Sequence, residues 1–192
     1  MAALPLDQII CGIPELAGHA RSHVTHVLSI LDPAEPEPLA FADYPPHDRL
    51  TLRFDDVIEP IPGYAPPMPE HIEQLLRFGR EIGADALQTL LIHCHAGVSR
   101  STASATALLL QAFPELRADE VLDHIGQVRP QAWPNSRMIG FADEQLRHGG
   151  TLVAALNEFY RRRLAVEPGL AEMMRAGSRG AEVERATRKP PG

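Results

Sequence analysis

The stretch LLIHCHAGVSRSTASA, residues 90–105, joins an apolar run to a segment of small residues. Its first three residues are a continuous apolar run, which is typical of a central strand covered on both faces. Small residues then begin a segment that reads as a helix over residues 101–113, and a proline ends it. Cys94 and Arg100 therefore lie at a strand-to-helix junction, with five residues between them.

This junction combines an anion site with a nucleophile. A loop that curls into a helix N-terminus directs several backbone N–H groups into one concavity, and the helix dipole adds positive potential there. The planar guanidinium of Arg100 can bind two oxygens of a phosphate, and Gly97 permits a positive φ or a close backbone approach to the anion. The same surroundings favour a thiolate at Cys94. The residues alone thus indicate phosphoryl transfer through a cysteinyl-phosphate.

Two other interpretations of Cys94 are weaker. A cysteine in an apolar strand is often an inert core residue, and we expect this of Cys11. Zinc binding by His93, Cys94 and His95 is disfavoured because alternate residues leaving a strand point to opposite faces, and no second ligand pair follows. We therefore expect no metal and no cofactor.

The rest of the chain alternates between predicted strands and helices. Short β-branched or period-two runs predict strands at residues 9–11, 23–31, 50–54 and 90–92. Helical spacing predicts helices at residues 69–82, 101–113, 121–128, 137–146 and 151–164. Proline-rich loops occupy residues 32–38 and 55–69. The expected fold is a single α/β domain, with a central, mainly parallel sheet of four to five strands flanked by helices.

Composition narrows the function and the surroundings. The chain has 192 residues and a formal net charge of -7, which argues against a nucleic-acid partner. No apolar run approaches the roughly 20 residues that cross a bilayer, and the first residues lack the basic start of a secretory signal. The two cysteines lie far apart in sequence, so a reducing cytoplasm is the expected compartment. Periodicity is lost after Pro168, which predicts a domain over residues 1–167 and a flexible tail over residues 168–192.

Two motifs together resemble a known family. The sequence HCHAGVSRS matches the pattern H-C-x5-R-[S/T] of the cysteine-dependent protein tyrosine phosphatases, at His93, Cys94, Gly97, Arg100 and Ser101. Downstream, RPQAWPN (residues 129–135) resembles the R-P-x3-P-N element of the dual-specificity-like branch. The likeness, to the bacterial type of this branch, covers roughly residues 8–160 and includes the order of strands and helices.

The resemblance implies roles for individual residues. Cys94 would attack phosphorus, Arg100 would bind the substrate and the transition state, and Ser101 would help the sulfur leave. His93 would support the loop. The equatorial oxygens would be held by the backbone amides of His95, Ala96, Gly97, Val98, Ser99 and Arg100. Asn135 would either brace this loop or serve only as a helix N-cap.

The family also uses an aspartic acid on a mobile loop as the general acid. Asp55 and Asp56 follow the predicted strand 50–54, at the end where ligands gather in α/β sheets. Asp56 continues the parity of the apolar face of that strand, so it is the stronger candidate. Glu59 is a third candidate, and both aspartates could instead be solvated loop residues.

The expected substrate is a phosphorylated protein or a small phosphomonoester. Phosphotyrosine is the first candidate, with phosphoserine, phosphothreonine and small aryl phosphates also open. A phosphoinositide phosphatase is an alternative, although the variable loop positions carry none of the lysines typical of that branch. A phosphate-binding module without turnover and a rhodanese-like sulfur transferase are the remaining alternatives.

Overall fold

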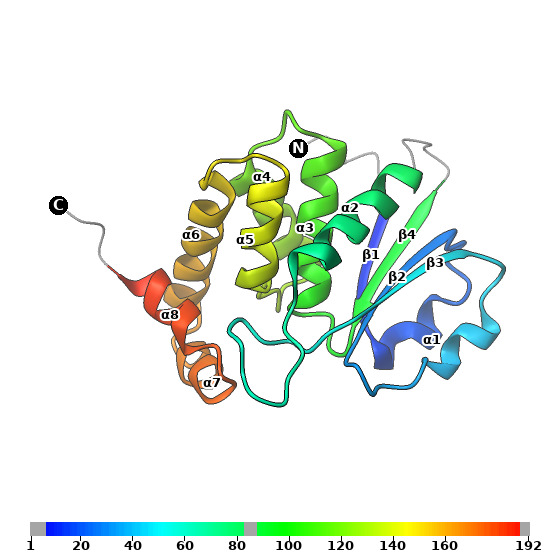
Figure 1. The fold of residues 1–192 in the computed structure, drawn as a ribbon, viewed down its shortest axis with the longest axis horizontal. Coiled ribbons are helices and arrows are strands. Elements are labelled where there is room, and N and C mark those ends of the chain that lie inside the picture. The colour runs from blue at the N-terminus through cyan, green and yellow to red at the C-terminus, as the bar shows by residue number, and fades with distance from the viewer. Residues whose placement is uncertain (1–6, 83–87, 189–192) are drawn as a thin grey trace.

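Four parallel strands form the centre of the protein. The computed structural model describes residues 7–82 and 88–188. The strands are ordered β1-β4-β2-β3, and every pair is parallel (Figure 1). Their bounds are β1 Asp7–Gly12, β2 His26–Leu31, β3 Asp48–Arg53 and β4 Thr89–Cys94. The sequence-based expectation of a mainly parallel sheet of four to five strands in an α/β domain is confirmed.

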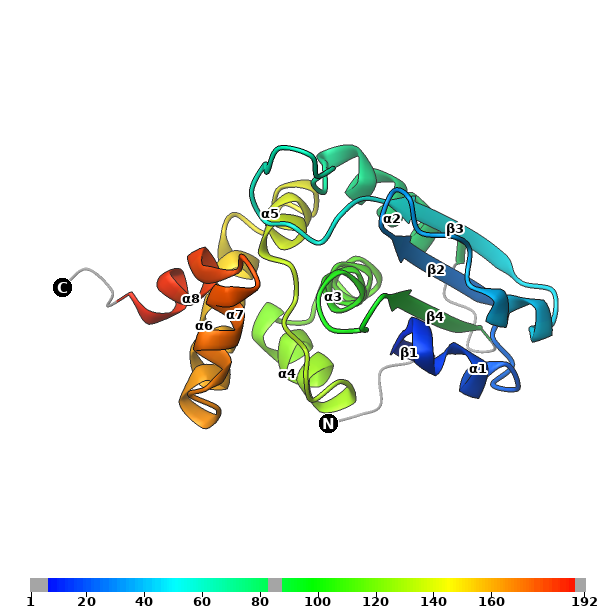
Figure 2. The ribbon, with the colours of Figure 1, turned by 90° about the horizontal axis from the view of Figure 1, so that it is seen from below.

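Helices cover the sheet unequally. One face carries four long helices, α2 Pro69–Ile82, α3 Arg100–Ala112, α4 Ala118–Val128 and α5 Ser136–Gln145 (Figure 2). Three short helices lie on the other face, η1 Ile13–Glu15, α1 Leu16–His19 and η2 Leu39–Asp43. A further helix, α6 Thr151–Val166, packs on α4 and α5. In the described residues, no helix is both long and apolar enough to span a bilayer.

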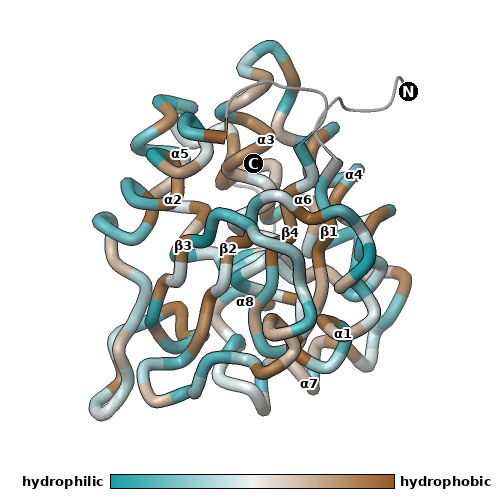
Figure 3. Tube along the Cα trace, turned by 90° about the vertical axis from the view of Figure 1, so that its right-hand side faces the viewer, coloured by the Kyte–Doolittle hydropathy of each residue, from teal (hydrophilic) through white to brown (hydrophobic). Residues whose placement is uncertain are grey.

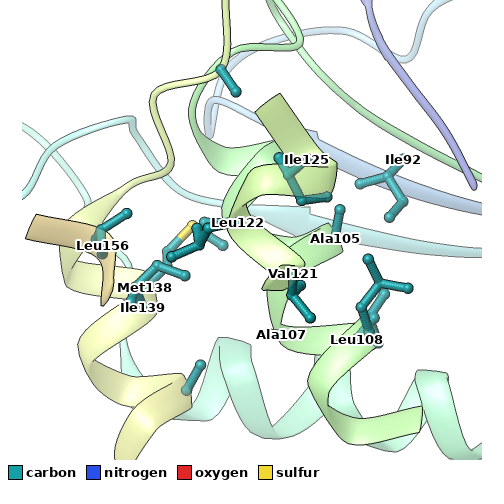
Figure 4. Packing of buried hydrophobic residues seen from close by; sticks show 14 of the residues in the cluster. Ile92, Ala105, Ala107, Leu108, Val121, Leu122, Ile125, Met138, Ile139 and Leu156 are labelled. Atoms are coloured by element: carbon teal, nitrogen blue, oxygen red, sulfur yellow. The ribbon is translucent and has the colours of Figure 1, made fainter. Parts of the chain in front are cut away.

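The continuous apolar run of β4 is explained by its place between two strands and two layers of side chains. Leu90, Ile92 and Cys94 face the cluster under the long helices, whereas Leu91 faces the cluster around α1. Figure 3 shows the hydrophobic character concentrated along the strands and lower on the outer loops. Small residues let α3 lie close to this strand, with Ala105 near Ile92 in Figure 4.

The segment after residue 168 contains helices that the sequence pattern does not indicate. We predicted a flexible tail over residues 168–192, but the structure has two helices there, α7 Leu170–Ala176 and α8 Gly180–Thr187. The helix α8 packs on α6 and on α7 (Figure 1). Its stability comes from a few buried apolar residues and a buried ion pair, which give no periodic pattern. Residues 189–192 lie outside the described part, and the domain boundary at residue 167 stays a prediction.

Candidate active site

The residues of the candidate site gather at the carboxyl edge of the sheet. Cys94 ends β4, Asp32 follows β2 directly, and Asp56 lies in the loop that follows β3. In parallel sheets this edge is where ligands bind, because the loops that leave neighbouring strands meet there. The loop over residues 94–100, called loop 94–100 below, is the central feature of this edge.

Gly97 sets the shape of loop 94–100. Its φ is +68°, a value that side chains rarely allow. A Cβ atom here would lie 2.5 Å from the carbonyl carbon of Cys11, so the loop packs directly on the end of β1. The expected positive φ at Gly97 is present, and the close approach of its backbone to an anion stays a prediction.

The carbonyl groups of loop 94–100 are bound from outside the loop. The backbone N–H of Ile13 donates to His95 O at 2.9 Å, and Trp133 N–H donates to Val98 O at 2.9 Å. Arg129 donates to the two carbonyls between them, at 3.0 Å each. None of the backbone N–H groups of residues 96–100 donates to another group within the described chain. These N–H groups are therefore available to an anion, as the sequence predicts.

Cys94 lies at the base of loop 94–100. Its side chain is buried, and its Sγ is 3.3 Å from the hydroxyl oxygen of Ser101. Ser101 is in the first turn of α3, and this position brings its hydroxyl to the sulfur. The N-terminus of α3 adds positive potential beside Cys94, an arrangement that suits a thiolate.

Arg100 is buried and only partly satisfied. Its Nη1 donates to Phe54 O and to Asp32 Oδ1, both at 2.6 Å. Its Nε is buried and has no hydrogen-bond partner within the described residues. A buried guanidinium donor without a partner is costly, so this group is suited to receiving an oxyanion.

Asp32 is a site residue that our sequence analysis missed. It lies between the guanidinium of Arg100 and the imidazole of His95, because its Oδ2 is also 3.7 Å from His95 Nε2. Glu35 reaches the same imidazole at 3.9 Å. We treated residues 32–38 as a proline-rich loop only. The signal was present, since an acidic residue directly after a parallel strand lies at the ligand-binding edge.

The structure separates the two acid candidates. Asp55 folds back on its own loop, where its carboxylate accepts the N–H of Ala65 at 2.6 Å. Asp56 instead points to loop 94–100, and its Oδ1 accepts the hydroxyl of Ser99 at 2.7 Å. Asn135 Nδ2 and Arg179 Nη1 donate to the same oxygen, at 2.8 and 3.1 Å. Its location therefore agrees with the preference for Asp56.

Asn135 combines the two roles that we considered as alternatives. Its Oδ1 accepts the N–H groups of Arg137 and Met138, so it is the N-cap of α5. Its backbone N–H donates to Ser99 O at 3.3 Å, and its Nδ2 donates to Asp56. One side chain thus connects α5, loop 94–100 and the candidate acid.

His93 faces away from the sulfur. Side chains alternate along β4, so His93 lies on the α1 side of the sheet, with Nε2 2.7 Å from Ser29 Oγ and its ring tilted against Phe41. Burial, together with the nearby Arg49, lowers the pKa of His93 from 6.5 to about 4. The imidazole is therefore neutral at pH 7, and any support it gives to the loop passes through the strand.

Comparisons with known proteins agree with this geometry. No known protein-family profile matches the chain. The MAP kinase phosphatase with leucine-rich repeats protein 2 of Dictyostelium discoideum is 30% identical over 150 residues, 73% of this chain and 18% of that protein. The crystal structure of human DUSP28 has a TM-score of 0.57 at 18% identity, covering 73% of this chain and 92% of that one. For the structure of DUSP15 the TM-score is 0.53 at 25% identity, over 82% and 94%.

The fold is therefore that of the cysteine-dependent protein tyrosine phosphatase superfamily, in its dual-specificity branch, and the resemblance seen in the sequence is confirmed. The chain spans about a fifth of the length of the curated relative from Dictyostelium. That the chain is of the bacterial type within this branch stays a prediction.

Proposed function

We propose that the protein hydrolyses phosphomonoesters, phosphotyrosine first among them, through a phosphate bound covalently to Cys94. The observation that carries this proposal is the site around the sulfur. A buried thiol lies 3.3 Å from Ser101, and within the described part of the chain neither the N–H groups of residues 96–100 nor the Nε of Arg100 has a hydrogen-bond partner. Phosphoryl transfer needs a nucleophile and fixed positive groups around the equatorial oxygens, and this loop has both.

In the first step, the thiolate of Cys94 attacks phosphorus. An S–P bond forms and the P–O bond to the leaving group breaks. The leaving oxygen takes a proton from Asp56, because a phenolate is a poor leaving group when its conjugate acid has a pKa of ~10. Arg100 and the loop N–H groups stabilise the charge on the three equatorial oxygens throughout.

In the second step, water releases the phosphate. Asp56, now a carboxylate, takes a proton from the water as its oxygen attacks phosphorus and the S–P bond breaks. The hydroxyl of Ser101 donates a hydrogen bond to the departing sulfur, which it already contacts at 3.3 Å. The products are inorganic phosphate and the free thiolate.

The substrate follows from the loop composition. The variable positions His95, Ala96, Val98 and Ser99 include no lysine, so the loop offers no extra cation for a second phosphate. The acidic Asp32 beside Arg100 further disfavours polyanionic headgroups. We therefore infer a protein phosphomonoester as the substrate. A phosphoinositide is the alternative to test, and a reducing, cytoplasmic setting suits the two free cysteines.

The test is hydrolysis of phenyl phosphate, a phosphotyrosine peptide and a phosphoinositide by the wild-type chain, Cys94→Ser and the matched control Cys11→Ser. We expect vanadate-sensitive turnover of the first two substrates in the wild type and in Cys11→Ser. Cys94→Ser should be inactive while still binding phosphate. Turnover in Cys94→Ser would disprove the covalent route. Phosphate binding without turnover in the wild type would mean a binding module, and preference for the lipid would overturn the substrate assignment.

A further inference from the structure

The two helices at the C-terminal end of the described chain lie against the candidate active site. We call α7 and α8 with the turn between them, residues 170–187, the C-terminal arm (Figure 2). Arg179 lies in that turn and is 6% exposed. Its Nη1 donates to Ser99 Oγ at 2.9 Å and to Asp56 Oδ1 at 3.1 Å. A residue far along the chain thus contacts both loop 94–100 and the candidate acid.

Glu182 fixes the opposite edge of the same guanidinium. Nε and Nη2 of Arg179 donate to the two oxygens of Glu182 at 2.8 and 2.9 Å, a bidentate pair. Glu182 is fully buried and also accepts from Trp133 Nε1 at 2.6 Å and from the N–H of Ser136 at 2.9 Å. Trp133 and Ser136, which lie on both sides of Asn135, thus hold Glu182, and Glu182 holds Nε and Nη2 of Arg179. Nη1 is the nitrogen that points to the site.

The charge of Arg179 is maintained despite its burial. Burial acts to lower the pKa of the guanidinium, but the negative charges of Glu182 and Asp56 outweigh it and raise the pKa. A cation at this place fixes Oδ1 of Asp56, so that Oδ2 is left for the proton of the leaving group.

The hydrogen bonds around Ser99 are consistent with a single orientation of its hydroxyl group. Its hydroxyl donates to Asp56 at 2.7 Å, and its lone pair accepts from Arg179 at 2.9 Å. Ser99 is also the residue before Arg100 and the N-cap position of α3. The arm therefore fixes the acid relative to the loop that would bind the phosphoryl group.

We propose that Arg179 is a positioning residue, which holds Asp56 and Ser99 in the geometry needed for proton transfer to the leaving group. This proposal rests on the proposed function. It makes the C-terminal arm part of the active site, although the sequence pattern there predicts a tail. Arg179 acts through Asp56 and contacts no reacting atom.

The test compares substrates that differ in their need for an acid. Nitrophenyl phosphate has a good leaving group, whereas phenyl phosphate has a leaving group like that of phosphotyrosine. In Arg179→Met, we expect kcat for phenyl phosphate to fall about 10- to 100-fold more than kcat for nitrophenyl phosphate. In the background of Asp56→Asn, Arg179→Met should change the ratio of the two kcat values no further.

A purely structural role would give a different result. Partial unfolding lowers both kcat values equally and leaves their ratio unchanged, so an unchanged ratio overturns the proposal. If Arg179→Met does not fold, Arg179→Lys decides, because one ammonium group cannot hold Glu182 and Asp56 together. If the ratio of kcat for phenyl phosphate to kcat for nitrophenyl phosphate is lowered in Arg179→Lys, the proposal is supported, and if it is unchanged the proposal is overturned.

A matched control removes a cation from the same arm. Arg185 is exposed on α8 and donates to Ser136 Oγ at 2.8 Å, away from Asp56. Arg185→Met should keep the wild-type ratio, and a change as large as that in Arg179→Met would overturn the proposal. A wild-type chain that hydrolyses neither ester would mean instead that the proposed function itself is wrong.

Discussion

The carboxylate of Asp32 accepts a hydrogen bond of 2.6 Å from Nη1 of Arg100, the guanidinium at the end of loop 94–100. Arg100 is almost fully buried, whereas the side chain of Asp32 is 39% exposed. A carboxylate in this place competes with an oxyanion for the same guanidinium. Its single negative charge also repels the anion that would bind beside it.

Replacing Asp32 should therefore strengthen anion binding. We expect Asp32→Asn to lower the inhibition constant for vanadate about fivefold, a modest effect because the side chain is partly solvated. The measurement is vanadate inhibition at constant pH and ionic strength. Glu35→Gln is the control, since Glu35 reaches only His95, at 3.9 Å, and should have a smaller effect. Weaker inhibition in Asp32→Asn would mean that Asp32 orients Arg100 rather than competing for it.

The two neighbouring aspartates should behave differently. Asp56→Asn is expected to reduce kcat for phenyl phosphate about 100-fold or more and to flatten the basic limb of the pH profile, because the amide carries no transferable proton. Asp55→Asn should lose much less activity, since the Asp55 carboxylate accepts the N–H of Ala65 in its own loop. Steady-state pH profiles of both variants check this. A larger loss in Asp55→Asn would reverse the assignment.

Glu182 should be important for stability. Its removal leaves the buried Arg179 without its bidentate partner, and breaking such a pair costs about 3–5 kcal/mol. We expect Glu182→Ala to reduce the free energy of unfolding by that amount in urea denaturation. Glu172→Ala on the exposed face of α7 is the control and should change stability by less than about 0.5 kcal/mol. Equal losses in the two variants would contradict a specific role for the buried pair.

His93 should make the fold sensitive to mild acid. Its pKa is about 4 in the folded protein and 6.5 when exposed, so the unfolded chain binds more protons between these values. Stability is therefore fully present above pH 6.5 and is lost as the pH falls towards 4, by about 2–3 kcal/mol. Urea unfolding at several pH values, compared between the wild type and His93→Gln, isolates this contribution. If the free energy of unfolding has the same slope against pH in the two proteins, this would argue against a buried neutral histidine.

Much of the site was accessible from the sequence because it is built from local patterns. The apolar run of β4, Gly97 at the positive φ and the helix that starts at Arg100 all leave recognisable patterns within residues 90–105. The preference for Asp56 over Asp55 came from strand parity, which continues into the loop. Each of these inferences depends on contacts between residues close in sequence.

The parts that were missed depend on contacts between distant residues. Arg179 and Asp56 are far apart in the chain, and neither residue carries a pattern that indicates their 3.1 Å contact. Only four of the arm's residues are large and apolar, Leu170, Met173, Met174 and Val183, so its hydrophobic periodicity is weak. The arm is held instead by a buried ion pair, whereas charged residues in a sequence normally indicate solvated surface.

Trp133 is the single tryptophan of the chain, and its indole N–H donates to Glu182 while its ring stacks on Tyr160 at 4.1 Å. Its fluorescence therefore originates from one buried place, where the arm meets the segment that precedes α5. Detachment of the arm would expose the indole to water and shift its emission to longer wavelength. The protein thus contains an intrinsic optical reporter of whether its C-terminal helices are docked, and no label is needed to follow that equilibrium.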